Sequence, residues 1–130
     1  MLVFLFHVLS YDVWFYLSHL LLHTKIGWRF HKIHHEKRAP TFADTYYGHW
    51  SEGPFQSLGF LLPFAFGVWH PSAVLAALVA VNCRGILRHD ARAAWLIGDH
   101  HLQHHVDPRY NFGDYWIDAL CGTAAPRGTN

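Results

Sequence analysis

Hydrophobic residues at the start of the chain follow a pattern that predicts one long helix. Residues 1–22 are almost wholly apolar, and that length is enough to cross the roughly 30 Å hydrocarbon core of a bilayer as an α-helix. Asp12, His19 and His23 interrupt the run at i, i+7 and i+11, so they share one stripe of the helix. A polar stripe on a lipid-facing helix must turn toward protein or a cavity. The alternative is an amphipathic core helix of a soluble bundle.

Two further apolar runs predict a helical hairpin. They cover residues 55–69 and 72–87, and the His70-Pro71 pair between them predicts a turn. Each run is short for a relaxed span, but a hairpin with a proline turn suits a tight or partial crossing. The hairpin returns the chain to the side on which the first helix ends. The His-rich segments on either side of the hairpin can therefore meet.

The remaining segments predict short helices and turns. Residues 88–109 are charged and histidine-rich, and we expect them to be helical at least through His100–His105. Tyr110-Asn111-Phe112-Gly113 predicts a turn. Residues 114–120 then predict a short amphipathic helix, with Gly122 at its end.

A cluster of positive charge follows the first helix. Residues 24–38 contain five basic side chains among histidines and aromatics, and by the positive-inside rule this cluster marks the cytoplasmic face. Ala39-Pro40 ends any helix there. Residues 41–54, which include His49, are predicted to be a loop or an interfacial segment.

Composition agrees with a single membrane domain covering residues 1–130. Hydrophobic residues make up 52% of the chain and charged residues only 15%, against about 25% in a soluble domain. The net charge of +1 gives no indication of a nucleic-acid partner. Cys83 and Cys121 belong to no Cys-x-x-Cys motif, which argues against a disulfide or a thiolate zinc site. We expect both to be ordinary buried thiols.

Histidines are the most informative residues, and 13 of them occur. Two His-x-x-His-His motifs place imidazoles at i, i+3 and i+4, and one His-x-x-x-His pair places them at i and i+4. Side chains at these spacings lie on one face of a helix. The eight residues concerned are His19, His23, His31, His34, His35, His101, His104 and His105.

Eight imidazoles predict a dinuclear metal site. A structural zinc ion takes four ligands and a catalytic one three, so eight ligands are too many for one ion and suit two. Spacing alone does not choose among zinc, copper, iron and nickel. His89, His100 and His49 are further candidate ligands, and His7 and His70 are read as ordinary histidines. Carboxylates that would orient the ligands from a second shell are Asp12, Asp90, Asp99 and Asp118.

These motifs resemble the three histidine boxes of the fatty acid hydroxylase/sterol desaturase superfamily. The ending Tyr110-Asn111-Phe112-Gly113, followed by Trp116-Ile117-Asp118 and Gly122-Thr123, is similar to the family's Asn-Tyr-Gly and Trp-Asp…Gly-Thr ending. His89 resembles the lone histidine that many members carry between boxes two and three, and it completes a predicted set of nine ligands. The resemblance covers most of residues 12–123.

The resemblance implies an all-α integral membrane protein with a cytosolic cap of histidine-bearing helices around two iron ions. It also implies a di-iron enzyme that uses O₂ to hydroxylate or desaturate a sterol or fatty acyl C–H bond. Electrons would come from NAD(P)H through cytochrome b5 or a ferredoxin-type carrier. The site would face the cytoplasm from a bacterial inner membrane or the endoplasmic reticulum.

Two departures from the family pattern stand out. Leu20 occupies a position of box one where arginine is common. Members are also longer and usually have membrane helices before box one, so we expect a minimal or an N-terminally truncated form. Alternative functions are a carotenoid hydroxylase, which has related boxes, and a metal-binding membrane protein without turnover. A soluble four-helix di-iron protein is disfavoured, because those sites use Glu-x-x-His motifs and the sequence contains none.

Overall fold

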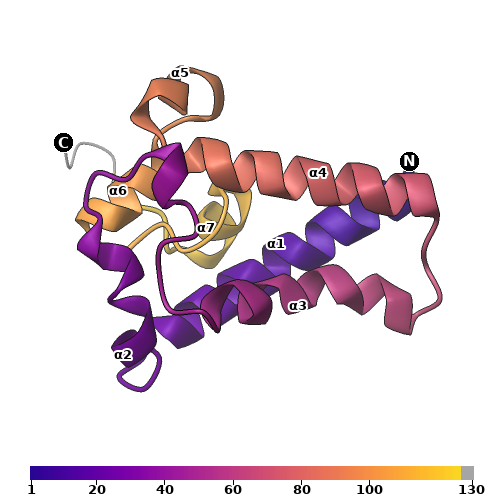
Figure 1. Ribbon diagram of the computed structural model, residues 1–130, viewed down its shortest axis with the longest axis horizontal. Coiled ribbons are helices and arrows are strands. Elements are labelled where there is room, and N and C mark those ends of the chain that lie inside the picture. The colour runs from indigo at the N-terminus through magenta and orange to yellow at the C-terminus, as the bar shows by residue number, and fades with distance from the viewer. Residues whose placement is uncertain (127–130) are drawn as a thin grey trace.

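The apolar N-terminal run forms one helix, α1 (Leu2–Leu22), as predicted. The computed structural model describes residues 1–126, and every regular element within them is helical (Figure 1). The all-α class is therefore confirmed for that part of the chain. The other long helices are α3 (Glu52–Ala65) and α4 (Pro71–Arg88), and the short elements are α2 (Trp28–His31), α5 (Ala94–Ile97), α6 (His100–Val106), α7 (Tyr115–Cys121) and the 3₁₀ helices η1 (His34–Glu36), η2 (Phe42–Asp44) and η3 (Ala91–Ala93).

The predicted hairpin is formed by α3 and α4, and α1 packs along both of its arms (Figure 1). Helix α3 begins three residues before the apolar run, because its first turn tolerates the polar Glu52 and Gly53. It ends at Ala65, and Gly67 follows in the left-handed conformation common just after a helix C-terminus. The cluster of apolar side chains between the three helices consists of Phe60, Ala77 and Val81 with Phe4, Val8, Tyr11 and Val74 around them.

Helices α1 and α3 approach each other most closely at Gly59. A Cβ atom at this position would overlap the Trp14 side chain and the backbone oxygen of Ser10. On either side of this contact, side chains of α1 bond to carbonyl groups of α3. Trp14 Nε1 donates to the Phe55 oxygen at 2.7 Å, and His7 Nδ1 lies 3.0 Å from the Phe60 oxygen. The packing and the hydrogen bonds together fix α3 on α1.

The polar stripe of α1 faces the interior, as predicted. Asp12 and His19 are buried and His23 is half-buried. Asp12 is paired with the guanidinium group of Arg84 from α4, and Arg84 also lies 2.5 Å from a carboxylate oxygen of Asp114, just before α7. This ion-pair network ties α1, α4 and the C-terminal segment together.

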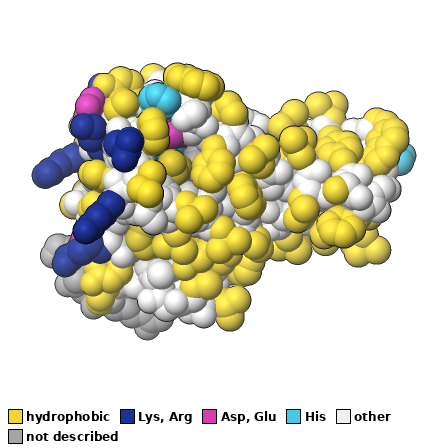
Figure 2. Space-filling model, turned by 90° about the horizontal axis from the view of Figure 1, so that it is seen from below, with side chains coloured by type: hydrophobic (Ala, Val, Ile, Leu, Met, Phe, Trp, Pro, Cys, Tyr) yellow, Lys and Arg dark blue, Asp and Glu magenta, His cyan; other side chains and the backbone are white. Residues whose placement is uncertain are grey.

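Large apolar side chains such as Leu17, Leu61 and Val79 are exposed on the long helices, and the face seen in Figure 2 is largely apolar. Helices α1 and α4 are long and apolar enough to cross a membrane, and only 17% of the apolar window of α4 is buried. A core helix of a soluble protein would be mostly covered, so the exposed faces are those expected next to lipid. Cys83 and Cys121 are exposed, contrary to the expectation of buried thiols; Cys83 lies on α4, most of whose surface is uncovered.

The short elements gather at the end of the bundle where α1 finishes, and the N-terminus lies at the opposite end (Figure 1). We refer to residues 23–51 and 89–126 as the cap. The apolar core beside it is small: Tyr16 packs with Phe112 and Ile117. Helix α7 ends at Gly122 in a left-handed conformation, as predicted.

Candidate metal centre

Nine histidines converge at the junction of the bundle and the cap, and they form two groups. Within each group, one nitrogen of every ring lies within 4.8 Å of the corresponding nitrogens of the others. The five-histidine group consists of His19, His23, His31, His35 and His104, and the four-histidine group of His34, His89, His101 and His105. These are the nine residues that the sequence predicts as ligands, and their binding of a metal stays a prediction.

Each His-x-x-His-His motif contributes to both groups. His31 is the last residue of α2 and His34 starts the 3₁₀ helix η1, so the three imidazoles of this motif do not lie on one continuous helix. His31 and His35 enter the five-histidine group, whereas His34 enters the other. In the motif on α6, His104 enters the five-histidine group, whereas His101 and His105 enter the four-histidine group. The groups adjoin, since the ring centroids of His35 and His105 are 5.0 Å apart.

Backbone carbonyls fix the orientation of four rings through Nδ1. The Nδ1–oxygen distances are 2.5 Å for His19 and Phe112, 2.5 Å for His104 and Tyr110, 2.8 Å for His34 and Tyr47, and 2.7 Å for His89 and Gly85. A carbonyl oxygen only accepts hydrogen bonds, so Nδ1 carries the hydrogen in each ring. In a neutral imidazole the other nitrogen, Nε2, then presents a lone pair.

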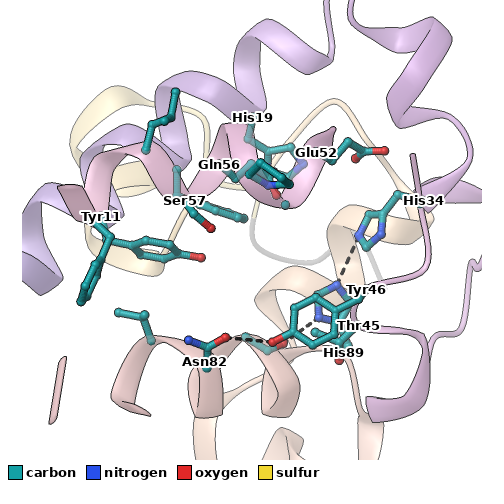
Figure 3. A pocket seen from close by; sticks show the side chains of 18 of the residues that line it. Tyr11, His19, His34, Thr45, Tyr46, Glu52, Gln56, Ser57, Asn82 and His89 are labelled. Atoms are coloured by element: carbon teal, nitrogen blue, oxygen red, sulfur yellow. Dashed lines mark hydrogen bonds between the residues drawn. The ribbon is translucent and has the colours of Figure 1, made fainter. Parts of the chain in front are cut away.

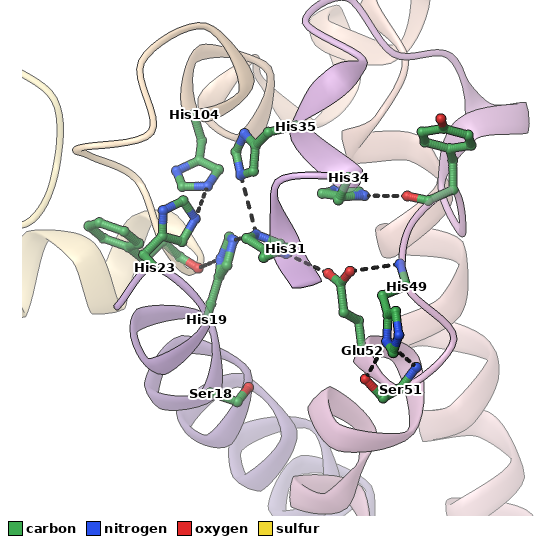
Figure 4. A network of polar contacts seen from close by, with 12 residues as sticks. Ser18, His19, His23, His31, His34, His35, His49, Ser51, Glu52 and His104 are labelled. Carbon is green, nitrogen blue, oxygen red and sulfur yellow. Dashed lines mark hydrogen bonds and ion pairs between the residues drawn. The ribbon is translucent and has the colours of Figure 1, made fainter. Parts of the chain in front are cut away.

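A fifth ring, His31, is oriented by a carboxylate. Its Nδ1 lies 2.5 Å from Glu52 Oε2, while Glu52 Oε1 accepts the amide hydrogen of His49 at 2.9 Å (Figure 4). Glu52 is only 7% exposed. Burial favours a raised pKa, but the hydrogen bonds from His31 and His49 outweigh it and hold the pKa of Glu52 below its usual value. Glu52 is therefore a carboxylate, and it accepts the Nδ1 hydrogen of His31.

Lone pairs face each other inside both groups. His19 Nε2 lies 2.9 Å from His31 Nε2 (Figure 4), and His89 Nε2 lies 3.2 Å from His34 Nε2. In the neutral form of all four rings the hydrogen is on Nδ1, so neither contact has a hydrogen to share, and the lone pairs repel. A cation between them would convert repulsion into coordination. Both ring nitrogens of His105 are also buried without a hydrogen-bond partner within residues 1–126. The donor set fits a metal ion in each group.

Burial favours the neutral form of His23, His89, His104 and His105. Loss of solvent is the largest cause, and neighbouring imidazoles add to it. The pKa falls to about 2 for His23 and His105, to about 3 for His89 and to about 4 for His104. Neutral imidazole is the form that binds a metal, so no proton has to leave these rings at pH 7.

Two possible further ligands lie outside both groups. His100 is bonded through Nε2 to Asp118 at 2.9 Å, and His49 bonds through Nδ1 to the Ser51 hydroxyl. His70, read as an ordinary histidine, lies at the start of α4, at the end of the bundle away from the cap.

Within residues 1–126, none of the four predicted second-shell aspartates is hydrogen-bonded to one of the nine rings, and their second-shell role stays a prediction. Asp12 pairs with Arg84 of α4, and Asp90, which caps η3, pairs with Arg92 two residues further on; guanidinium–carboxylate pairs are strong hydrogen bonds. Asp99 accepts from Gln103 one turn further along α6.

Asp118 acts one step further from the centre. It is fully buried and accepts the amide hydrogens of Phe112 and Gly113 at 2.9 and 2.7 Å. These bonds hold the Phe112 carbonyl that orients His19. Asp118 therefore supports a ring of the five-histidine group through the backbone.

Sequence reasoning missed Glu52. Within residues 1–126 it is the only carboxylate hydrogen-bonded to any of the nine rings. The sequence predicts a loop or an interfacial segment for residues 41–54, where a buried carboxylate is not expected. A signal was available, because Glu52 follows His49 by three residues and lies three residues before an apolar run. Acidic residues are frequent in the first turn of a helix.

An interhelical cavity of about 730 Å³ reaches the centre from the bundle. It lies between α1, α3 and α4, and its walls include His19, His31, His34 and His89 (Figure 3). Most of the other lining side chains are apolar or aromatic. A volume of this size accommodates a lipid-sized ligand.

The sequence model of the family described as "Fatty acid hydroxylase" matches residues 4–123. Mouse (Mus musculus) lathosterol oxidase is 32% identical over 115 residues, which make up 81% of this chain and 38% of the relative. The chain thus spans less than two fifths of the length of that protein. No solved structure gives a significant match.

Proposed function

Because the chain belongs to the fatty acid hydroxylase family, we propose that it is a membrane di-iron enzyme that uses O₂ to hydroxylate or desaturate a lipid. The observation that carries this proposal is the convergence of nine imidazoles, in two adjoining groups, at the inner end of an apolar cavity. The family accounts for the choice of iron, which ligand type alone does not make.

The two groups would hold one iron ion each. Neutral nitrogen ligands do not cancel the positive charge of the metal, which favours a strongly electrophilic centre. Bound iron would supply O₂ activation and the oxidising power that an unactivated C–H bond requires. Hydroxylation consumes one O₂, two electrons and two protons per alcohol formed, and it releases one water.

The residues of the chain contribute positioning and enclosure. Hydrogen bonds to Nδ1 lock five rings with their Nε2 lone pairs directed inward, so the ligands need little rearrangement when metal binds. The apolar walls of the cavity exclude water and accept a hydrocarbon chain. The substrate would be a sterol or fatty acyl lipid that enters from the membrane side of the bundle, in keeping with the relative named lathosterol oxidase.

The centre would face the cytoplasm. Basic side chains lie around the histidine-bearing end of the molecule, whereas the opposite end of the bundle is apolar (Figure 2). The positive-inside rule assigns the basic end to the cytoplasmic side. An electron-transfer protein, of the cytochrome b5 or ferredoxin type, would dock there and draw its electrons from NAD(P)H.

The experiment compares the wild-type chain with His104→Ala in a host membrane. His104 belongs to the five-histidine group and is completely buried. We expect the wild-type protein to contain iron, to consume O₂ when a reductant and lipid are supplied, and to change the lipid profile of the host. The variant should insert into the membrane but lose iron and activity. A metal-binding protein without turnover would hold iron and consume no O₂, and normal iron in the variant would contradict the ligand assignment.

A further inference from the structure

The interhelical cavity carries polar side chains that the metal centre does not use. Tyr11 comes from α1, while Gln56 and Ser57 come from α3, and all three line the cavity. The hydroxyl groups of Tyr11 and Ser57 point into its interior (Figure 3). Within residues 1–126, none of these three side chains has a hydrogen-bond partner.

The surrounding wall makes these unpaired groups informative. Much of the rest of the cavity surface is hydrocarbon or aromatic ring, contributed by residues such as Phe15, Phe60, Leu61, Leu78 and Val81. An entirely apolar ligand would cover three polar groups and leave them without partners, which is unfavourable. A ligand with an oxygen at this position would satisfy them. Tyrosine and serine hydroxyls and a glutamine amide all both donate and accept hydrogen bonds, and a hydroxyl group matches both roles.

The polar groups lie at a distance from the histidines. Tyr11 precedes His19 by eight residues on α1, which corresponds to about 12 Å along the helix axis. Gln56 follows Glu52 by four residues on α3, or about 6 Å. A ligand that occupies both regions therefore has its oxygen roughly 10 Å from the atom that faces the centre.

We propose that Tyr11, Gln56 and Ser57 form a subsite for a hydroxyl group of the lipid substrate. The substrate class is then a hydroxylated lipid in which the hydroxyl lies roughly 10 Å from the carbon that is oxidised. The identification of that carbon rests on the proposed function. Recognition of the hydroxyl does not, because binding at this end of the cavity needs no iron.

The test measures binding of two matched probes, methyl stearate and methyl 12-hydroxystearate, by equilibrium dialysis with radiolabelled esters. The full chain is purified in detergent and studied with and without iron. We expect the wild-type protein to bind the hydroxylated ester at least 10-fold more tightly, because a site built for a hydroxyl discriminates against the analogue that lacks it. Tyr11→Phe and Ser57→Ala should reduce the ratio to about threefold or less. Ser72→Ala, on the exposed first turn of α4 and outside the cavity, is the matched control and should keep the full ratio.

Equal affinity for the two esters in the wild-type protein would overturn the proposal, and so would an unchanged ratio in both cavity variants. Circular dichroism identifies a variant that has lost its helices. If one cavity variant is unfolded, the affinity ratio of the other cavity variant tests the proposal. If the ratio is present but no lipid is oxidised, the subsite stands and the proposed function fails. If lipid is oxidised but the two esters bind equally well, the proposed function stands and the subsite proposal fails.

Discussion

At the scale of single residues, the second shell makes the two histidine groups unequal. The five-histidine group contains His31, whose Nδ1 hydrogen is accepted by a buried carboxylate. In the four-histidine group, His34 and His89 bond to backbone carbonyls. A carboxylate is a stronger hydrogen-bond acceptor than a carbonyl oxygen, so it polarises the Nδ1–H bond more. The ring then becomes a stronger electron donor to the metal. The metal ion held by the five-histidine group should therefore experience the stronger ligand field.

Glu52→Gln tests this inequality. The amide keeps the shape of the side chain but removes its charge, and we expect iron affinity at the five-histidine group to fall about 10- to 100-fold. The other group should be unaffected. A two-step iron titration against a competing chelator measures both affinities. Glu36→Gln is the matched control, since Glu36 is exposed and bonds to the Tyr47 hydroxyl. Equal losses in both steps would mean that the variant disturbs the fold.

His89→Ala probes the other group. His89 is buried, its Nδ1 bonds to the Gly85 oxygen, and its Nε2 meets His34. The variant should weaken iron binding at the four-histidine group alone, on the order of 10- to 100-fold. His70→Ala removes an exposed imidazole far from the centre and should change nothing. Loss of iron in a His49→Ala protein, together with normal iron in His89→Ala, would show that the wrong intermediate histidine was chosen.

At the scale of helices and turns, spacing predicted eight of the nine histidines that come together, and the family resemblance added His89, but neither indicated what holds them. Ligands on one helix recur at i, i+3 and i+4, so their periodicity is visible in the sequence. Their Nδ1 partners are mostly backbone oxygens, such as those of Tyr47 and Phe112, brought in by turns of the cap. Every residue has a backbone carbonyl group, so the residue types in the sequence do not indicate which carbonyl will bond to a histidine. The four aspartates were chosen for their chemistry, but Arg84 and Arg92 compete for two of them.

The contact between α1 and α3 is the element-scale feature most sensitive to a single methyl group. Gly59→Ala would push a Cβ into the Trp14 side chain and the Ser10 carbonyl. We expect a loss of about 1–3 kcal/mol in the free energy of unfolding, as is typical of overpacking. Gly53→Ala adds the same methyl group to the same helix in open space and serves as the control. Thermal unfolding in detergent, followed by circular dichroism, compares the two variants. Equal melting temperatures would contradict the close packing.

At the scale of the whole molecule, both histidine-bearing segments lie at one end and the α3–α4 turn at the other (Figure 1). In a membrane this arrangement predicts which positions a reagent outside the cell can reach. With Cys83 and Cys121 replaced, a cysteine introduced at Lys37 or Arg92 should be protected from an impermeant thiol reagent applied outside. A cysteine introduced at Trp69 should be labelled. The opposite pattern would reverse the orientation.

The division of each His-x-x-His-His motif between two groups has a consequence for how the protein matures. The cap has little hydrocarbon of its own to bury beyond Phe112 and Ile117, and its interior is made largely of imidazoles. Metal ions would therefore stabilise the cap in the way that a hydrophobic core stabilises most domains. Because α6 and the α2–η1 segment each reach both groups, the two compartments share the same walls. Starvation for metal should therefore loosen the cap as one unit while the long helices stay assembled.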